Sequence, residues 1–84
     1  MKVVVKFFYE FQKITGKKEI EIEIKKNSTI QDLIKFLETI YPGIKYITEY
    51  HEDYSVLLNG IHVNPTKTLK EKDVIDLFTI IDGG

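Results

Sequence analysis

The sequence contains no cysteine among its 84 residues, and this absence removes several kinds of chemistry. There is no disulfide framework, no thiolate metal site and no thiol nucleophile. Any sulfur that the protein handles must therefore come from another molecule. Arginine is absent too: the twelve basic residues are all lysines, and thirteen acidic residues bring the formal net charge to −1. Without a net positive field, the chain is not expected to bind nucleic acid.

Long apolar runs are also absent. No segment reaches the roughly 18 apolar residues of a membrane-spanning helix, and no signal-peptide pattern is found. We therefore expect a cytoplasmic protein that does not associate with membranes. The length predicts a single domain over residues 1–84, because so short a chain cannot enclose two independent cores. Enzymes with elaborate cofactor pockets rarely fit in this size.

Two segments in the N-terminal third carry strand patterns. Residues 2–8 are rich in β-branched and aromatic side chains, and residues 19–25 alternate strictly between charged residues and isoleucine. We expect these segments to pair antiparallel. Between them, Phe11 and Ile14 have the spacing of a short helix, and Gly16 is its predicted stop.

One longer amphipathic helix follows. Ser28 precedes Gln31 by three residues, the spacing of a capping box, and Pro42-Gly43 ends the pattern. The apolar positions recur at helical spacing and predict one buried face, made of Ile30, Leu33, Ile34, Leu37, Ile40 and Tyr41.

The C-terminal half is predicted to be mostly strand. Residues 44–54 are interpreted as a polar connection, and Asn59-Gly60 between two apolar runs is a strong hairpin signal. A final strand is expected over residues 74–81. The order of two strands, one helix and three strands predicts an α+β, ubiquitin-like β-grasp fold. In it, a mixed sheet of about five strands carries one main helix on one face, and the first and last strands are neighbours.

Residues able to form a catalytic or metal site are few. Glu49, His51 and Asp53 form only a weak three-ligand pattern, which we interpret as a solvated loop, and no metal site is expected. His62 is interpreted as an exposed strand residue, and Ser55 has no base beside it in sequence. No glycine-rich phosphate loop is present. We therefore do not expect an enzyme complete in one chain.

The last residues, Asp82-Gly83-Gly84, carry the strongest functional signal. A terminal glycine pair presents its carboxylate on a slender stalk that can enter a narrow active site. We expect a flexible tail of about residues 79–84. Upstream, Val74, Phe78 and Ile80 share one face of the last predicted strand, and an apolar outer face is typical of a docking surface.

In their order, these motifs resemble the ubiquitin-like sulfur carriers, namely the small subunit of molybdopterin synthase (MoaD type) and the ThiS type of thiazole synthesis. The resemblance covers nearly the whole chain. It rests on the first strand, the stretch Phe11–Gly16, the helix start at residues 28–33, Tyr41-Pro42-Gly43, the turn at Asn59-Gly60, Asp73-Val74, Phe78 and the final Gly83-Gly84.

The resemblance implies a carrier. An E1-like activating enzyme of the MoeB or ThiF type would adenylate Gly84 with ATP, and a persulfide donor would convert it to a thiocarboxylate. No cofactor would be tightly bound, because the partner enzyme uses the ATP. A MoaE-type large subunit of molybdopterin synthase would receive the tail; the tail residues are Ile81, Asp82 and Gly83, and the residues expected to contact the partner are Phe8, Val74, Phe78 and Ile80.

Some residues depart from the MoaD pattern, and other functions stay open. Thr79 and Ile80 stand where many MoaD-type tails carry prolines, and Lys72 stands where a glycine often precedes the aspartate. The stretch 9–18, which ThiS-type carriers generally shorten, favours the molybdopterin branch, with molybdenum or tungsten as the final metal. The alternatives are a ThiS-like carrier for thiamine, a ubiquitin-like modifier conjugated to lysine, and a non-covalent β-grasp binding module.

Overall fold

The two N-terminal strand patterns form an antiparallel hairpin in a computed structural model, which describes residues 1–50 and 53–80. Strand β1 spans Lys2–Phe7 and strand β2 spans Glu19–Glu23. Their register pairs Val3 with Ile22, and both side chains are buried. The short helix predicted between the strands is confirmed as α1 (Glu10–Thr15), and it ends at a left-handed Gly16.

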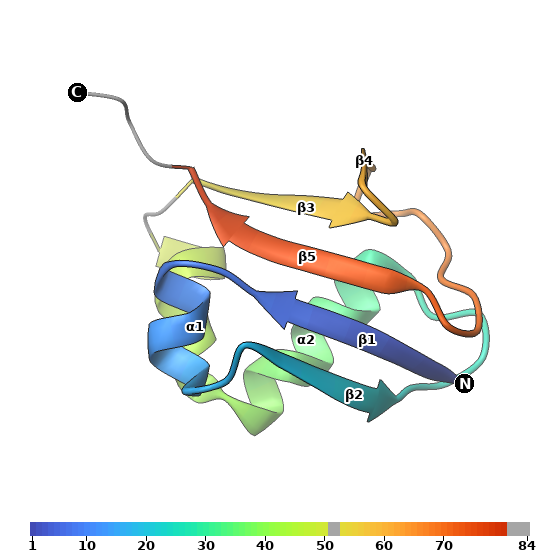
Figure 1. The fold of residues 1–84 in the computed structure, drawn as a ribbon, viewed down its shortest axis with the longest axis horizontal. Coiled ribbons are helices and arrows are strands. Elements are labelled where there is room, and N and C mark those ends of the chain that lie inside the picture. Colours follow the sequence, from blue (N-terminus) through green and yellow to red (C-terminus); the bar gives the residue numbers. More distant parts are fainter. Residues whose placement is uncertain (51–52, 81–84) are drawn as a thin grey trace.

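Three further strands complete the sheet, in the order β2-β1-β5-β3-β4. They are β3 (Tyr54–Leu58), β4 (Ile61–His62) and β5 (Val74–Thr79). Strands β1 and β5 are parallel neighbours, and the other pairs are antiparallel. In Figure 1 these two strands run through the middle of the sheet, and the main helix α2 (Ile30–Ile40) crosses behind it. The predicted β-grasp fold is confirmed.

The core lies between α2 and the sheet, because the apolar stripe of α2 faces the inward side chains of β1 and β5. Among residues 1–50 and 53–80 it holds sixteen buried apolar side chains, and an edge-to-face contact of Phe7 with Tyr41, whose ring centroids are 5.9 Å apart, extends it at one end. The largest fully buried side chains of this cluster come from β1, α1, α2, the turn after α2, the segment before β5 and β5 itself: Phe7, Phe11, Ile30, Leu33, Leu37, Ile44, Leu69, Ile75 and Leu77.

The start of α2 differs from the prediction by one residue. The capping box is formed by Thr29 and Asp32, not by Ser28 and Gln31: the Thr29 hydroxyl accepts from the Asp32 amide, and the Asp32 carboxylate accepts from the Thr29 amide. The Ser28 hydroxyl is used in the preceding turn, where it donates to the carbonyl of Lys25 at 2.6 Å. An ionised carboxylate is also a stronger hydrogen-bond acceptor than a neutral amide such as that of Gln31, and it is favoured near the positive end of the helix dipole.

The segment predicted as a polar connection contains two helical turns. A 3-10 turn spans Pro42–Ile44 and a π-helical turn spans Tyr46–Tyr50, and they bury Ile44 and Ile47. The prediction of a polar connection missed these two residues, because a single i, i+3 pair among polar residues and tyrosines is a weak helical pattern and no glycine stop follows it, as Gly16 follows Phe11 and Ile14. Asp53 lies beyond the turns, while His51 of the weak three-ligand pattern lies outside the described residues.

Two tight turns fix the start of β5. The hairpin predicted at Asn59-Gly60 is confirmed, with positive φ at both residues. The Asn59 side chain also joins this turn to the last strand, because its amide donates to Asp73 and its oxygen accepts from the amide of Val74. Lys72 has φ 69°, so the lysine in place of glycine costs about 1 kcal/mol there.

Strand β5 ends at Thr79, before the predicted strand end at residue 81 but inside the predicted tail. Thr79, which the expected tail included, is instead the last residue of β5, and it pairs with Tyr54 and is buried. The amide of Ile80 still donates to the carbonyl of Asp53 at 3.0 Å. The tail was predicted to begin at about residue 79, but pairing with β3 continues through Thr79 and the Ile80 amide still bonds to Asp53. The prediction therefore places the start of the tail too early.

Candidate docking face and carrier terminus

The face of the sheet opposite α2, here called the open face, carries the side chains that were predicted to contact a partner. Burial alternates along β5: Ile75 and Leu77 point into the core, whereas Val74 and Phe78 are half-buried on the other side. Ile80 continues this alternation and is 54% exposed. The structure therefore brings Val74, Phe78 and Ile80 to one face, and their contact with a partner stays a prediction.

Phe8 lies on the same face, at the end of the neighbouring strand. Strands β1 and β5 are in parallel register up to the pair Phe7 and Leu77, and the amide of Phe8 donates to the carbonyl of Leu77 at 3.0 Å. Phe8 is 39% exposed. We call Phe8, Val74, Phe78 and Ile80 the open-face patch.

A carboxylate that sequence reasoning missed lies inside this apolar surface. Asp76 stands on β5 between Val74 and Phe78, in register with Lys6 on one side and Leu57 on the other. Its Oδ1 atom is buried and has no hydrogen-bond partner among residues 1–50 and 53–80. A buried oxygen without a donor is costly, so such atoms call for an explanation. A donor from a bound partner would satisfy this one; the signal in the sequence was an acidic residue within the apolar run of residues 74–78.

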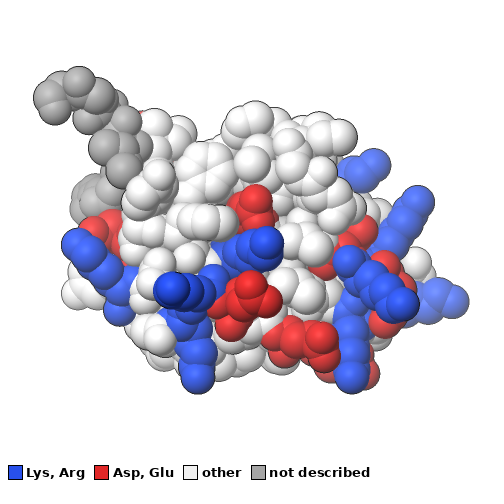
Figure 2. All heavy atoms as spheres, viewed as in Figure 1, with Lys and Arg blue, Asp and Glu red and all other residues white. Residues whose placement is uncertain are grey.

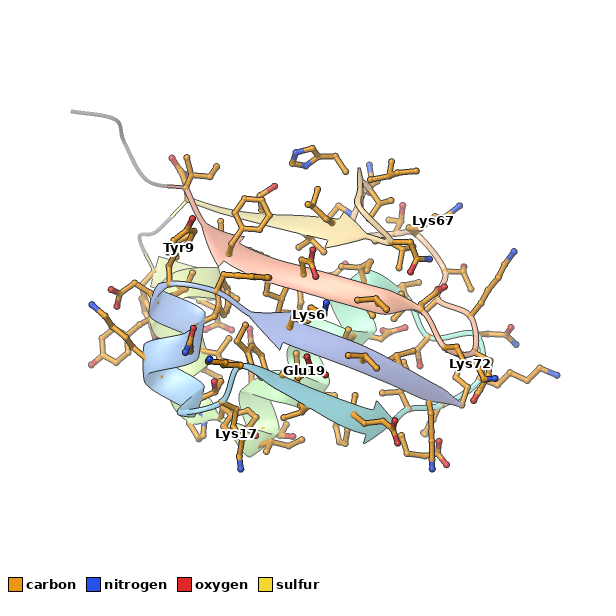
Figure 3. All side chains as sticks on the ribbon, viewed as in Figure 1. Lys6, Tyr9, Lys17, Glu19, Lys67 and Lys72 are labelled. Carbon is orange, nitrogen blue, oxygen red and sulfur yellow. The ribbon has the colours of Figure 1, made fainter. Side chains whose placement is uncertain are left out.

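Charge is distributed unevenly over the open face. Figure 2 shows mostly uncharged surface over β3 and β5, whereas basic and acidic groups alternate over β1 and β2. Lys6 and Glu19, which are paired in the strand register, lie on these two neighbouring strands on the side facing the viewer in Figure 3. The open-face patch is thus bordered by charge on one side, the usual anatomy of an apolar interface core with a polar rim.

Ser55 and His62 meet on the open face, although nothing near Ser55 in sequence indicated a base. The hydroxyl of Ser55 lies 3.1 Å from Nδ1 of His62, across the β3–β4 hairpin. No carboxylate within the described part of the chain bonds to this imidazole, and both groups face water. A nucleophilic triad needs a third, orienting group, and this pair has none among the described residues.

The residues predicted to react lie beyond the described part. Ile81, Asp82, Gly83 and Gly84 are outside the described residues, so their placement does not enter the geometry of the site. Within residues 1–50 and 53–80, no group of three or more His, Cys, Asp or Glu residues could hold a metal ion. None of the helices described is long and apolar enough to cross a membrane.

The model of the ThiS family matches residues 5–84. The chain belongs to the ThiS family. This ThiS-family chain is 28% identical to small archaeal modifier protein 3 of Haloferax volcanii over the full length of both chains. It is thus a small ubiquitin-like protein of the sulfur-carrier and modifier group, whose members are not themselves enzymes.

Two solved structures resemble this ThiS-family chain in fold and in sequence. One, from Pyrococcus furiosus, is described as a molybdopterin converting factor, subunit 1; it has a TM-score of 0.83 and 28% identity and covers 95% of this chain and 98% of its own. The other belongs to the complex of subunits 1 and 2 of the molybdopterin-converting factor of Helicobacter pylori. It has a TM-score of 0.61 and 26% identity over 100% of both chains.

Proposed function

We propose that this ThiS-family chain is the small, sulfur-carrying subunit of a molybdopterin synthase. In the proposal, Gly84 is adenylated, then thiocarboxylated, and then delivers its sulfur inside the active site of a MoaE-type large subunit. The observation that carries the proposal is the open-face patch. Folding leaves these four apolar side chains uncovered, on and beside the strand that leads in sequence to Gly83 and Gly84.

The chemistry follows from the poor reactivity of a carboxylate, whose leaving group would be oxide. In the first proposed step, a carboxylate oxygen of Gly84 attacks the α-phosphorus of ATP and pyrophosphate leaves, which gives an acyl adenylate. A persulfide anion then attacks the carbonyl carbon, and AMP leaves with the bonding electron pair. A thiol finally cleaves the sulfur–sulfur bond and leaves the thiocarboxylate. Because the chain has no cysteine, it has no thiol of its own to intercept the adenylate.

The open face would supply recognition in each of these steps. Phe8 and Phe78 provide aromatic side chains that a partner can desolvate, and such side chains are frequent centres of binding energy. The unpaired Oδ1 of Asp76, which is buried in the free chain, would accept a hydrogen bond from a partner donor, and this would remove the cost of leaving it unpaired. Three of the four docking residues and the terminus that reacts are then carried by β5 and its continuation, and Phe8 follows the neighbouring strand β1.

The molybdopterin branch is supported by the full-length similarity to a chain of the complex of subunits 1 and 2 of the molybdopterin-converting factor of Helicobacter pylori. The Pyrococcus furiosus protein, described as subunit 1 of such a factor, adds a second relative. We therefore propose a MoaE-type large subunit and an E1-like enzyme of the MoeB or ThiF type as partners.

A second candidate function, a protein modifier, is favoured by the similarity to small archaeal modifier protein 3 over the full length of both chains. The same acyl adenylate would then be attacked by a lysine amine, or by a thiol that passes it to one, and would end as an isopeptide. A ThiS-like carrier for thiazole synthesis would follow the sulfur route and differ only in the acceptor.

Reconstitution separates these functions. The chain is combined with the activating enzyme, ATP, a persulfide donor, the large subunit and cyclic pyranopterin phosphate, and the dithiolene product is measured. We expect product from the natural chain and none from a variant with one alanine appended after Gly84, with an unchanged melting temperature for that variant. A thiocarboxylated chain that yields no dithiolene, but isopeptides or a thiazole, would overturn the molybdopterin assignment. Full function after deletion of Gly83 and Gly84 would instead indicate a non-covalent binding module.

A further inference from the structure

A groove lies beside the β2 edge of the sheet, apart from the open-face patch, and the proposed function makes no use of it. It has a volume of about 700 Å³ and runs between residues 23–28, which end β2 and form the following turn, and the N-terminal half of α2. None of its lining residues belongs to the open-face patch. A role for this groove is therefore independent of the carrier function.

The floor of the groove is apolar, although it opens to water. Ile24 and Leu33 form part of it and are nearly inaccessible, while Phe36 is 42% exposed. Phe36 does not belong to the buried core cluster. Its neighbour one turn later, Ile40, is 45% exposed but does not line the groove, so Phe36 is the aromatic side chain that an occupant would meet.

The adjoining strand edge offers main-chain hydrogen bonds. The amide of Ile24 donates to the carbonyl of Met1, and the amide of Phe7 donates to the carbonyl of Lys18. In an antiparallel ladder the bonded pairs alternate with unbonded ones, so the even-numbered residues of β2 face β1. The backbone groups of Glu19, Glu21 and Glu23 consequently point away from β1, along the free edge of the sheet.

The charged side chains of β2 decide which kind of strand can pair with its free edge. The side chains of Glu19, Glu21 and Glu23 lie on the open face, and those of Ile20 and Ile22 lie on the α2 side, as does Ile24, which lines the groove just after the end of β2. Figure 3 shows Glu19 near the β2 edge of the sheet. A second copy of the chain would bring glutamates against glutamates, which is unfavourable between directly opposed strand residues. On the β1 side, Glu21 is paired with Lys2 and Glu23 with the N-terminal amine of Met1, so basic residues on an added strand would continue this alternation of charge at the free edge.

We propose that the β2 edge and its groove bind an extended segment of a partner protein by strand addition. The segment carries apolar residues at alternate positions, which enter the groove beside Leu33 and Phe36, and basic residues between them, which face the glutamates. Lys25 and Lys26 line the groove after the end of β2 and select an acidic residue where the segment leaves the sheet. Main-chain bonds provide affinity, and the alternation of charge provides specificity.

The test uses a synthetic peptide with capped ends, in which isoleucine and lysine alternate and two aspartates follow. A titration of the isotope-labelled chain is followed by amide NMR shifts. We expect the largest shifts at the amides of Glu19, Glu21 and Glu23 and around Phe36. A peptide of the same sequence, N-methylated at alternate residues to block the ladder bonds, should bind at least about tenfold more weakly, and so should a peptide with glutamate in place of lysine.

Two variants of the chain provide matched controls. Phe36→Ala should weaken binding of the lysine peptide by about tenfold, whereas Ile40→Ala, on the same helix and equally exposed but outside the groove, should leave it unchanged. Either of two results would overturn the proposal: shifts confined to the open-face patch, or equal binding of the blocked and unblocked peptides. The absence of any shift at about 1 mM peptide would overturn it as well.

Discussion

On the covered face of β5, Ile75 and Leu77 are 0% and 1% exposed, whereas on the open face of the same strand Val74 and Phe78 keep part of their surface in water. Packing against α2 explains the first pair. Folding does not require the second, because a solvated sheet face is stable with polar side chains, as the glutamates of β2 illustrate. The apolar character of the open face therefore points to recognition by a partner, and each prediction below tests the difference between the two faces.

The largest expected effect is on stability, and it should be confined to the covered face. Leu77→Ala should lower the free energy of unfolding by about 2–5 kcal/mol, because it leaves a cavity in the core. Phe78→Ala should lower it by no more than about 1 kcal/mol, yet weaken binding to the large subunit by about tenfold or more. Urea denaturation and a binding titration measure the two effects, and equal losses of stability would remove the distinction between the faces.

A smaller loss of stability is expected when the buried carboxylate of Glu38, on the α2 side of the sheet, loses its hydrogen-bond donor. Glu38 on α2 is 5% exposed and accepts a 2.6 Å hydrogen bond from the hydroxyl of Thr48. Thr48→Val should cost about 1–3 kcal/mol in urea denaturation, because the carboxylate loses this donor while staying buried. Thr39→Val is the control, since this exposed hydroxyl bonds only to the carbonyl of Phe36 and should cost about 0.5 kcal/mol or less. A similar cost for both would show that the Glu38 contact is unimportant.

Removing the carboxylate of Asp76 on the open face should stabilise the fold, whereas Thr48→Val should destabilise it. Asp76 has an unpaired buried oxygen, so Asp76→Val should raise the free energy of unfolding by about 1 kcal/mol while weakening the affinity for the large subunit. Thermal denaturation and the same binding titration measure both quantities on one variant. A stabilised variant that binds its partner normally would show that the oxygen of Asp76 has no role in recognition.

The smallest expected change in stability appears only at high pH and concerns the phenol of Tyr54, which lies on the α2 side of the sheet. Burial, and to a lesser extent the charge of Glu38, raise the pKa of Tyr54 above its ordinary value. The protonated phenol therefore stabilises the fold fully below the unfolded-state pKa, and this contribution is lost as the pH rises through the higher folded-state pKa. Relative to Tyr54→Phe, which keeps the ring contact with Phe11, the natural chain should lose stability above about pH 10. An unchanged difference between the two proteins from neutral pH upward would contradict this.

Local, periodic features of the fold were predictable from the sequence. The alternation in residues 19–25 specified β2, with Ile22 buried and Ile20 half-buried on its inner face, and Asn59-Gly60 specified a turn that few other residue pairs can form. The helical stripe predicted from Ile30 to Tyr41 is buried from Ile30 to Leu37, but the prediction was wrong at Ile40, which is 45% exposed at the end of the helix. In each case the conformation is decided by residues that are close together in the sequence.

The features that were not predicted depend mostly on contacts between segments. Ser28 is partly an exception, because its hydroxyl bonds to nearby Lys25, but Thr29 formed the cap in its place while a β-bridge to the distant Thr68 held its backbone. The approach of Ser55 to His62 follows from the register of the Asn59-Gly60 hairpin, whereas the unpaired oxygen of Asp76 follows from the pairing of β5 with β1 and β3, which no single segment encodes. The grouping of Phe8 with Phe78 required the parallel pairing of the first and last strands, which only the fold class suggested.

The central claim is that the open-face patch serves to present Gly84 to an activating enzyme. The most direct test incubates the chain with its E1-like enzyme, ATP and a persulfide donor and then measures the intact mass. The account predicts that one oxygen is exchanged for sulfur, that fragmentation locates the exchange at Gly84, and that Phe78→Ala slows the reaction without unfolding the chain. An unmodified mass, in a mixture whose enzyme activates another carrier, would contradict the account.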